Sequence, residues 1–287
     1  MTKISFASEY FDVKDTLFCG QIFRFKTVDN GYMVYTLDKC AYVETAGDTT
    51  TVFCEDFDKD YFERFFDLSR DYASICASAK LSGNEFLAEC AKYGKGIRIL
   101  NQDKTEMLFS FIISQNNNIP RIKGIIERLC AALGEKKLFM GKEYHAFPSV
   151  EKMAAQPLEF YTSIGLGYRA EYVRRLAVEI ANGLDINAYS ALPTEGLKRR
   201  LIALYGVGPK VADCVTLFGY HRADSFPVDT WIYKVYRENF NGTLTNREKI
   251  SKWFLSRFNE NAGYFQQYLF HYKRIKEKIE QQTQKSE

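Results

Sequence analysis

One short stretch, Gly206-Val207-Gly208-Pro209-Lys210, constrains the fold of this chain more than any other. Glycines at positions 206 and 208 allow a tight turn with positive φ, and the absence of a Cβ lets the backbone come close to a ligand. Pro209 suits the first position of a helix, where its missing N–H costs nothing. The free N–H groups and the positive dipole end of that helix would face the turn. The stretch therefore predicts a phosphate-binding turn at the start of a helix.

Lys210 stands at the mouth of this turn, where its amine can reach the sugar of a bound nucleotide, and Asp229 follows further along the chain. Cleavage of an N-glycosidic bond develops positive charge on the sugar, which a nearby carboxylate stabilises. A neutral amine can attack the anomeric carbon and form a Schiff base, which permits loss of the 3′ phosphate by β-elimination. The pair predicts a nucleophile at Lys210 and an assisting carboxylate at Asp229.

Both residues also have an ordinary structural interpretation. Lys210 can be a solvated lysine in a first helical turn, although a lysine there opposes the helix dipole. Asp229 can be the N-cap of a helix that begins at Thr230, and a capping aspartate can still serve chemistry.

The composition is that of an ordinary globular protein. With 287 residues and 46% hydrophobic content, the chain suits one large domain or two. No apolar run approaches the roughly 18 residues needed to span a membrane. The N-terminus lacks a basic segment followed by a hydrophobic core, so we expect no secretion signal. The net charge of +3 means that any basic surface for nucleic acid must be local.

The seven cysteines are odd in number and contain no C-x-x-C pair. They indicate reduced thiols rather than disulfides or a zinc site, and we expect no cofactor and no metal. Cys214 is the last of them. A C-terminal iron–sulfur cluster would need four more cysteines after Asp229, and the sequence has none there, so a protein with such a cluster is excluded.

Two regions follow one another along the chain, and together they predict an α+β fold. Aromatic and β-branched runs at 22–27, 32–37, 41–45 and 50–54, with a hairpin signal at Asp29-Asn30-Gly31, predict an antiparallel sheet. Residues 57–91 predict two or three helices packed on it. We expect residues 1–95 to form this N-terminal β-sheet domain with helices, and residues 96–287 to form an all-helical domain containing the hairpin.

Helix signals dominate the second region. Asp103 and Glu106 predict a capping box, and an apolar period ending at Gly134 predicts a helix from about residue 119. Other helices are expected to start near Ser149, Thr194 and Thr245, and the charged tail 273–287 to be a fraying helix end.

Four further clusters stand out, at residues 18–24, 114–121, 165–170 and 263–270. Three asparagines at 116–118 suit a turn between helices, because Asn tolerates the left-handed region. Tyr168 and Arg169, after two glycines, could wedge into a base stack and read a base edge. The ordinary interpretations are a turn, a glycine loop, a strand entrance and core aromatics, and no cluster decides alone.

Taken together, the clusters resemble the eukaryotic-type 8-oxoguanine DNA glycosylase/AP lyases of the helix-hairpin-helix Gly/Pro-Asp superfamily. The resemblance runs from about residue 15 to residue 270. GVGPKVADC and PVD are shared by much of the superfamily, whereas FCGQIFRF, SQNNNIPRI and GLGYRAEYV are more specific. The resemblance implies excision of 8-oxoguanine, preferentially opposite cytosine, through a lysine Schiff base with associated AP lyase activity. It also implies duplex DNA as the partner and a monomeric protein.

The resemblance further assigns a damaged-base pocket. Gly20 would offer its carbonyl to the N7 proton that only the oxidised guanine carries. Phe270 and Cys214 would sandwich the flipped base, and Gln266 would bond its Watson–Crick edge.

A second group of residues would hold the rest of the DNA. Asn116 would fill the space left in the duplex, Arg121 and Arg169 would read the unpaired cytosine, and Tyr168 would wedge the stack. The expected contacts to the DNA backbone come from Gly206, Gly208, Val211 and Trp231.

The chain departs from the family pattern at three positions. Tyr205 stands where the superfamily usually has proline, Pro120 lies in the segment after the asparagines, and Trp231 replaces a histidine that touches phosphate. The alternatives are a related glycosylase for other damaged bases, a non-catalytic helix-hairpin-helix module, and an unrelated α+β protein. We expect a cytoplasmic, nucleoid-associated protein in a prokaryote and a nuclear one in a eukaryote.

Overall fold

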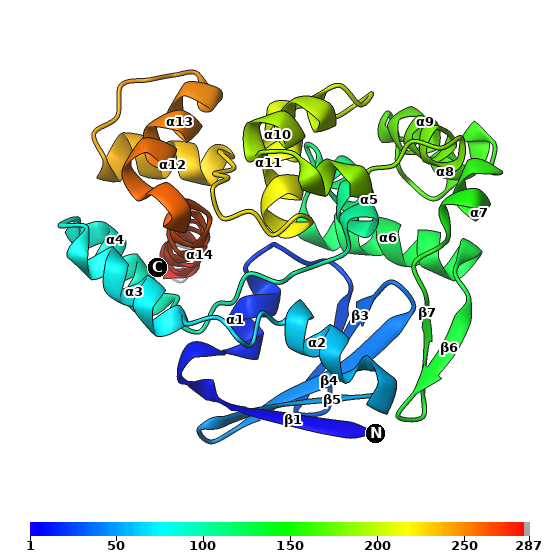
Figure 1. The fold of residues 1–287 in the computed structure, drawn as a ribbon, viewed down its shortest axis with the longest axis horizontal. Helices are drawn as coiled ribbons and strands as arrows, with labels where there is room; N and C mark the ends of the chain where they lie inside the picture. The colour runs from blue at the N-terminus through cyan, green and yellow to red at the C-terminus, as the bar shows by residue number, and fades with distance from the viewer. Residues whose placement is uncertain (284–287) are drawn as a thin grey trace.

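A five-stranded antiparallel sheet forms the N-terminal part of the computed structural model, which describes residues 1–283, with side chains as far as residue 275 (Figure 1). The strand order is β1-β5-β4-β3-β2. The strands are β1 (Thr2–Ala7), β2 (Phe25–Val28), β3 (Gly31–Thr36), β4 (Lys39–Ala46) and β5 (Thr49–Cys54). Four of them lie where the sequence predicts strands. The strand β1 was not predicted, because Ile4 is its one buried residue and the strand offers only two large apolar side chains, Ile4 and Phe6.

Two helices, α1 (Val13–Phe18) and α2 (Lys59–Phe65), close the core beside the sheet. Phe62, Phe65 and Phe66 are fully buried there, and Phe66 also packs against Phe11 at 5.4 Å between ring centres. The predicted hairpin is confirmed: Val28 pairs with Gly31, so Asp29 and Asn30 make the turn between β2 and β3.

The remaining helices form the second part of the molecule, drawn above the sheet in Figure 1. They are α3 (Tyr72–Leu81), α4 (Glu85–Tyr93), α5 (Lys104–Ser114), α6 (Ile119–Leu133), α7 (Val150–Ala154), α8 (Leu158–Ser163), α9 (Arg169–Ala181), α10 (Thr194–Ile202), α11 (Pro209–Phe218), α12 (Thr230–Asn239), α13 (Arg247–Phe258) and α14 (Ala262–Thr283), with short 3-10 turns at Asn187–Ala191 and Asn259–Asn261. Two further 3-10 turns, Ser8–Tyr10 and Asp56–Asp58, lie in the N-terminal part. Within the described residues, no helix is both long and apolar enough to cross a bilayer.

The helices α3 and α4 pack on α14 and share its core. Tyr72 of α3 and Tyr264 of α14 meet edge to face at 5.6 Å between ring centres. The predicted boundary at residue 95 stays a prediction, but the packing joins these two helices to the C-terminal part of the chain.

We expected the second part to be all-helical, but it also contains two strands. A hairpin of β6 (Lys136–Phe139) and β7 (Lys142–His145) lies beside the sheet (Figure 1). Its strands are short and polar, and Phe139 is their one buried residue, packed near Met33 and Tyr35. Because the two strands show so little alternation of apolar and polar residues, the hairpin could not be predicted from the sequence.

A buried ion pair connects the two parts. Arg24 donates to both carboxylate oxygens of Glu106 at 3.2 Å, and the same carboxylate accepts from the Leu37 N–H at 2.7 Å. Asp103 caps α5 as predicted, accepting from the Glu106 N–H at 2.8 Å. The reciprocal half of the predicted capping box is wrong, because the Glu106 side chain compensates the buried guanidinium of Arg24 instead.

Gln21 fixes the loop that follows α1. Its buried amide donates to the carbonyls of Arg98 at 2.7 Å and Thr16 at 3.0 Å, and its Oε1 accepts from the Leu100 N–H at 2.8 Å. Fully bonded buried amides of this kind specify one backbone position. The neighbouring residue, Gly20, is thereby held in place.

Candidate active site

The turn between α10 and α11 has the predicted hairpin form. Gly206 has a φ of +83°, and a Cβ there would lie 2.4 Å from the Tyr172 ring, so both the backbone and the packing require glycine. The expectation of a positive φ at Gly208 is wrong: its φ is −89°. A Cβ at Gly208 would meet nothing within 4 Å, so this position is open to an approaching ligand.

The start of α11 presents free backbone donors at this turn. Gly208 is the N-cap and Pro209 occupies the first turn, as predicted. The first amide that bonds within the helix is that of Ala212, which donates to the Gly208 carbonyl at 3.0 Å. The N–H groups of Lys210 and Val211 precede it and are available to an anion.

Five separate segments enclose a small cavity of about 50 Å³. They are α5, α11, α14, the loop after α1 and the segment before α12. Lys210 and Cys214 lie one turn apart on the same face of α11. The lining residues are Cys19, Gly20, Phe111, Lys210, Cys214, Phe218, Pro227, Asp229, Gln266, Gln267 and Phe270. All six predicted catalytic and base-pocket residues are among them.

Asp229 is the N-cap of α12, accepting from the Ile232 N–H at 2.9 Å. Burial raises the pKa of its carboxyl above the ordinary value, while the Ile232 N–H and the charge of Lys210 act in the opposite direction. Lys210 is partly buried, with its Nζ 5.5 Å from the centre of the Phe111 ring. The cavity therefore places an amine and a carboxylate around one small volume.

Two walls of the cavity are suited to a flat ring. Burial raises the pKa of the Cys214 thiol to about 11, so this wall is uncharged at neutral pH. Phe270, from α14, is partly exposed. Gly20 has a φ of +89°, and a Cβ there would come within 3.3 Å of the Phe270 ring. Glycine therefore keeps the loop backbone close to the ring.

Gln266 brings an unused acceptor to the cavity. Its Nε2 donates to the Pro227 carbonyl at 3.3 Å, whereas its buried Oε1 has no hydrogen-bond partner in the described part of the chain. Such groups are rare in proteins and call for a ligand or another reason. The cavity holds less than about two water volumes, so a purine enters only if lining side chains move.

The second predicted group lies at the start of α6 and α9. Asn116 is exposed with a φ of +45°, as expected of an asparagine in a turn. Asn118 caps α6 and Pro120 falls in its first turn, which accommodates the departure noted in the sequence. Arg121 is exposed and donates to the Gly165 carbonyl at 3.3 Å, and Tyr168 is 54% exposed.

Arg169 is not on this surface. Its side chain is 3% exposed, and its guanidinium donates to the carbonyls of Gln115 (2.7 Å) and Asn116 (2.8 Å). Gln115 in turn donates to the Gly206 carbonyl at 2.9 Å. Arg169 thus fixes the backbone of the asparagine turn from the protein interior. Gln115, which was not predicted from the sequence, connects that turn to the hairpin.

Two family models match successive parts of the chain. The N-terminal domain of 8-oxoguanine DNA glycosylase matches residues 3–108, and the helix-hairpin-helix Gly/Pro-Asp superfamily of base-excision DNA repair proteins matches residues 109–259. The chain belongs to the 8-oxoguanine DNA glycosylase family.

Solved structures and curated relatives agree with this assignment. An 8-oxoguanine glycosylase/lyase from Clostridium acetobutylicum, solved with double-stranded DNA containing cytosine opposite 8-oxoguanine, is 35% identical with a TM-score of 0.89. That match covers 94% of this chain and 93% of the other. A probable N-glycosylase/DNA lyase from Methanothermobacter thermautotrophicus is 30% identical over 200 residues, 63% of this chain and 64% of the relative. The N-glycosylase/DNA lyase of Saccharomyces cerevisiae is 35% identical over 159 residues, 51% of this chain and 42% of the relative. The chain thus matches less than two thirds of each of these two curated relatives.

Several lining residues of this family member were not predicted from the sequence. Phe218 continues the face of α11 that carries Lys210 and Cys214, so helical spacing could have found it. Phe111 stacks on Phe218 at 5.6 Å between ring centres, and Gln267 donates to the Cys19 carbonyl at 2.8 Å. These contacts join distant segments and leave no local signal. Trp231 is partly buried under the Lys234 ammonium, and its contact with DNA stays a prediction.

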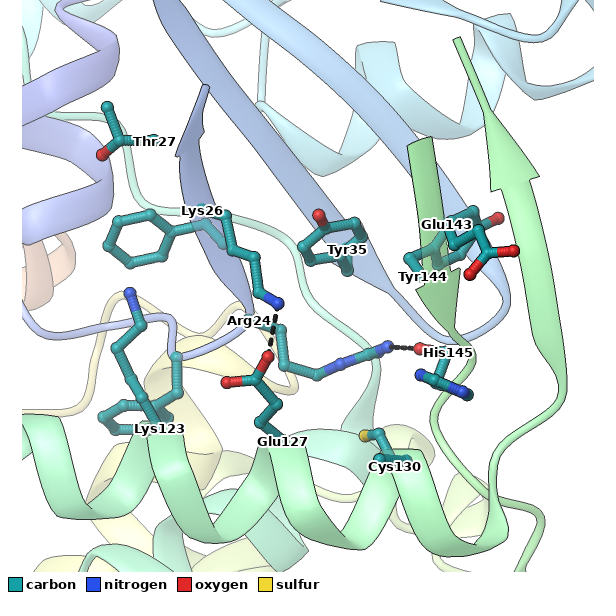
Figure 2. Close-up of a pocket in the computed structure, with 13 residues that line it drawn as sticks. Arg24, Lys26, Thr27, Tyr35, Lys123, Glu127, Cys130, Glu143, Tyr144 and His145 are labelled. Atoms are coloured by element: carbon teal, nitrogen blue, oxygen red, sulfur yellow. Dashed lines mark hydrogen bonds and ion pairs between the residues drawn. The ribbon is translucent and has the colours of Figure 1, made fainter. Parts of the chain in front are cut away.

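A much larger cavity, of about 620 Å³, lies elsewhere, between β2, α6 and the β6–β7 hairpin (Figure 2). Figure 2 shows Lys26 paired with Glu127 across it and Arg24 bonded to the His145 carbonyl. None of the predicted site residues lines this cavity. The active site is therefore recognised by its chemistry and not by its size.

Proposed function

We propose that this protein excises 8-oxoguanine from duplex DNA and then cleaves the resulting abasic site. The observation that carries the proposal is the single cavity lined by Lys210, Asp229, Gly20, Gln266 and Phe270. An amine, a carboxylate and two walls suited to a flat ring have no common use in a protein that only binds DNA. The likeness to the Clostridium glycosylase/lyase over nearly the whole chain supports it.

The reaction begins when the neutral amine of Lys210 attacks the anomeric carbon of the flipped nucleotide. The ionised carboxylate of Asp229 stabilises the positive charge that develops on the sugar. Loss of the base leaves the Lys210 nitrogen bonded to the anomeric carbon, and the Schiff base forms when the bond from that carbon to the ring oxygen breaks and the oxygen takes up a proton. A proton then leaves the 2′ carbon and the 3′ phosphate departs by β-elimination. The free N–H groups at the start of α11 hold the DNA phosphate in place meanwhile.

Recognition of the damage follows from the donors and acceptors of the cavity. The N7 of 8-oxoguanine carries a proton, and the Gly20 carbonyl is the acceptor proposed for it. The unpartnered Oε1 of Gln266 can accept from the Watson–Crick edge, which in guanine carries N–H donors. The uncharged thiol of Cys214 and the ring of Phe270 stack on the two faces of the base.

The partner base is proposed to be cytosine. Once its guanine is flipped out, cytosine presents acceptors at N3 and O2 that an arginine can meet. Arg121 is exposed at the start of α6, next to the turn of Asn116. All these groups come from one chain, so we propose that a monomer acts on the duplex.

The proposal is tested by measuring excision from duplexes that carry 8-oxoguanine opposite each of the four bases. We expect release of 8-oxoguanine, fastest opposite cytosine, and strand cleavage at the abasic site. Binding to the duplexes without release of any base would contradict the proposal and favour a non-catalytic DNA-binding protein. Release of an alkylated base in place of 8-oxoguanine would favour a related glycosylase.

A further inference from the structure

A buried arginine lies behind the base cavity and has no role in the reaction described so far. Arg274, one turn after Phe270 on α14, is 8% exposed and donates from Nη2 to the Phe18 carbonyl. Its buried Nε and Nη1 have no hydrogen-bond partner among the residues that the structure describes. A buried charge that is neither paired nor fully bonded is costly, so its retention calls for a reason.

Two walls of the cavity lie directly against this guanidinium. Nη1 is 3.4 Å from the position that a Cβ of Gly20 would take, and the guanidinium carbon is 5.3 Å from the centre of the Phe270 ring. Burial lowers the pKa of Arg274, while the charge of Asp229 acts in the opposite direction. Arg274 therefore adds positive potential to the side of the cavity that holds the base.

Excision places negative charge on that side. As the Lys210 nitrogen bonds to the anomeric carbon, the bond to N9 of the base breaks and its electron pair stays with the base. The base leaves as an anion and then takes up the proton that the newly attached nitrogen releases. Lys210 is the one lysine, arginine or histidine among the described residues that line the cavity, and its nitrogen bonds to the sugar at this step.

We infer that Arg274 stabilises the departing base as an anion, through the field that it adds behind Gly20 and Phe270. This inference rests on the proposed glycosylase function. A fixed charge in a site of low dielectric is effective over such distances, and it needs no reorganisation during the reaction. The other role open to Arg274 is a brace that holds the Phe18 carbonyl and so positions the loop of Gly20.

Two substitutions separate these roles. Arg274→Gln removes the charge, and its shorter side chain also ends before the position of the Nη2 donor. Arg274→Lys keeps the charge without the planar guanidinium that bonds the Phe18 carbonyl. Each variant is measured in two single-turnover reactions on one preparation: release of 8-oxoguanine opposite cytosine, and strand cleavage at a preformed abasic site. No base leaves in the second reaction. Because both rates come from one preparation, their ratio does not depend on how much of the variant is folded.

The expected result is a change in that ratio. Arg274→Gln should slow base release by about tenfold or more, less than the 10²–10³ typical of a donor that touches the developing charge. It should leave abasic-site cleavage within about twofold of the wild type, and Arg274→Lys should stay near the wild type in both reactions. An unchanged ratio in Arg274→Gln, with both rates lowered together or neither lowered, would overturn the inference. A wild-type protein that cleaves abasic sites but releases no 8-oxoguanine would instead overturn the proposed function itself.

Discussion

Asp229 combines a structural and a chemical role, and the two respond differently to substitution. Burial raises the pKa of its carboxyl, so the ionised form needed at neutral pH is held at a cost in stability. When the pKa of a carboxyl is higher in the folded protein than in the unfolded chain, its protonated form stabilises the fold. This contribution to the free energy of unfolding is complete at a pH below the unfolded pKa and is lost as the pH rises through the folded pKa. Asparagine caps nearly as well as aspartate and has no such loss.

Asp229→Asn should therefore unfold at a temperature equal to or above that of the wild type at pH 7, with the difference shrinking toward about pH 4. Base release should fall about 10²-fold or more, because the sugar cation loses its carboxylate. Thermal unfolding at both pH values and single-turnover excision check the two halves. A variant clearly less stable than the wild type at pH 7 would contradict the account of this carboxyl.

Arg121 is the exposed arginine at the start of α6, where the partner base is proposed to lie. Arg121→Ala should lower the preference for cytosine over adenine by about tenfold, since a good polar contact to a base is worth roughly 1–3 kcal/mol. Arg128 is a matched control, because it is also an exposed arginine of α6 that bonds a carbonyl of the same loop, that of Ile164, at 2.9 Å. Loss of selectivity in both variants alike would count against a specific role for Arg121.

At the scale of single residues, the burial and hydrogen-bond partners of long charged side chains could not be predicted from the sequence. The family motifs could be recognised in the sequence, and they assign site positions to Lys210, Asp229, Cys214 and Gln266. The fold then brings these four residues together around one cavity. Arg169 was expected at the surface, but its guanidinium reaches backbone carbonyls of a turn more than fifty residues away. Such partners depend on the tertiary structure, and nothing in the local pattern indicates them.

At the scale of elements, the hairpin between α10 and α11 offers a test with its own control. Gly206→Ala would place a Cβ 2.4 Å from the Tyr172 ring at a positive φ, and should destabilise the protein by about 2 kcal/mol or more. Gly208→Ala, at a φ of −89° and in open space, should change stability by less than about 0.5 kcal/mol. It should nevertheless weaken DNA binding, because its methyl group would occupy the open space through which a ligand approaches the turn. Chemical unfolding and duplex binding measure both effects, and equal destabilisation by the two substitutions would contradict the assignment.

The elements that could be predicted are those with a strong period. The helices expected near residues 103, 119, 149, 194 and 245 have such a period or a clear cap, and the strands β2 to β5 have aromatic and β-branched runs between turn residues. The structure confirms both groups. The strand β1 and the hairpin β6–β7 have one buried residue each, so their pairing is decided by neighbours that the local sequence does not reveal. The same limit applies to Glu106, whose carboxylate accepts from Arg24 and not from the backbone N–H of the predicted capping box.

At the scale of the whole molecule, a net charge of +3 leaves DNA binding to a few local groups. With Arg169 buried, the cations proposed to face DNA are Arg121 and Lys210, together with the amides of α11. The affinity for duplex DNA should fall as salt rises, and the slope of log Kd against log salt should correspond to only a handful of released counterions. Binding titrations over a range of salt concentrations measure it. An affinity independent of salt would contradict this arrangement.

The site as a whole is assembled from five segments spread over about 250 positions, so it depends on the complete fold. The proposed chemistry depends on one amine, that of Lys210. Borohydride trapping on a duplex with 8-oxoguanine opposite cytosine tests that claim most directly. The control variant is Lys123→Gln: burial lowers the pKa of the Lys123 amine, which makes it a competing nucleophile, but it lies in the other cavity. We predict that the wild type and Lys123→Gln form the covalent DNA adduct, and that Lys210→Gln binds the duplex yet forms no adduct and releases no base. An adduct that persists in Lys210→Gln would show that another amine is the nucleophile.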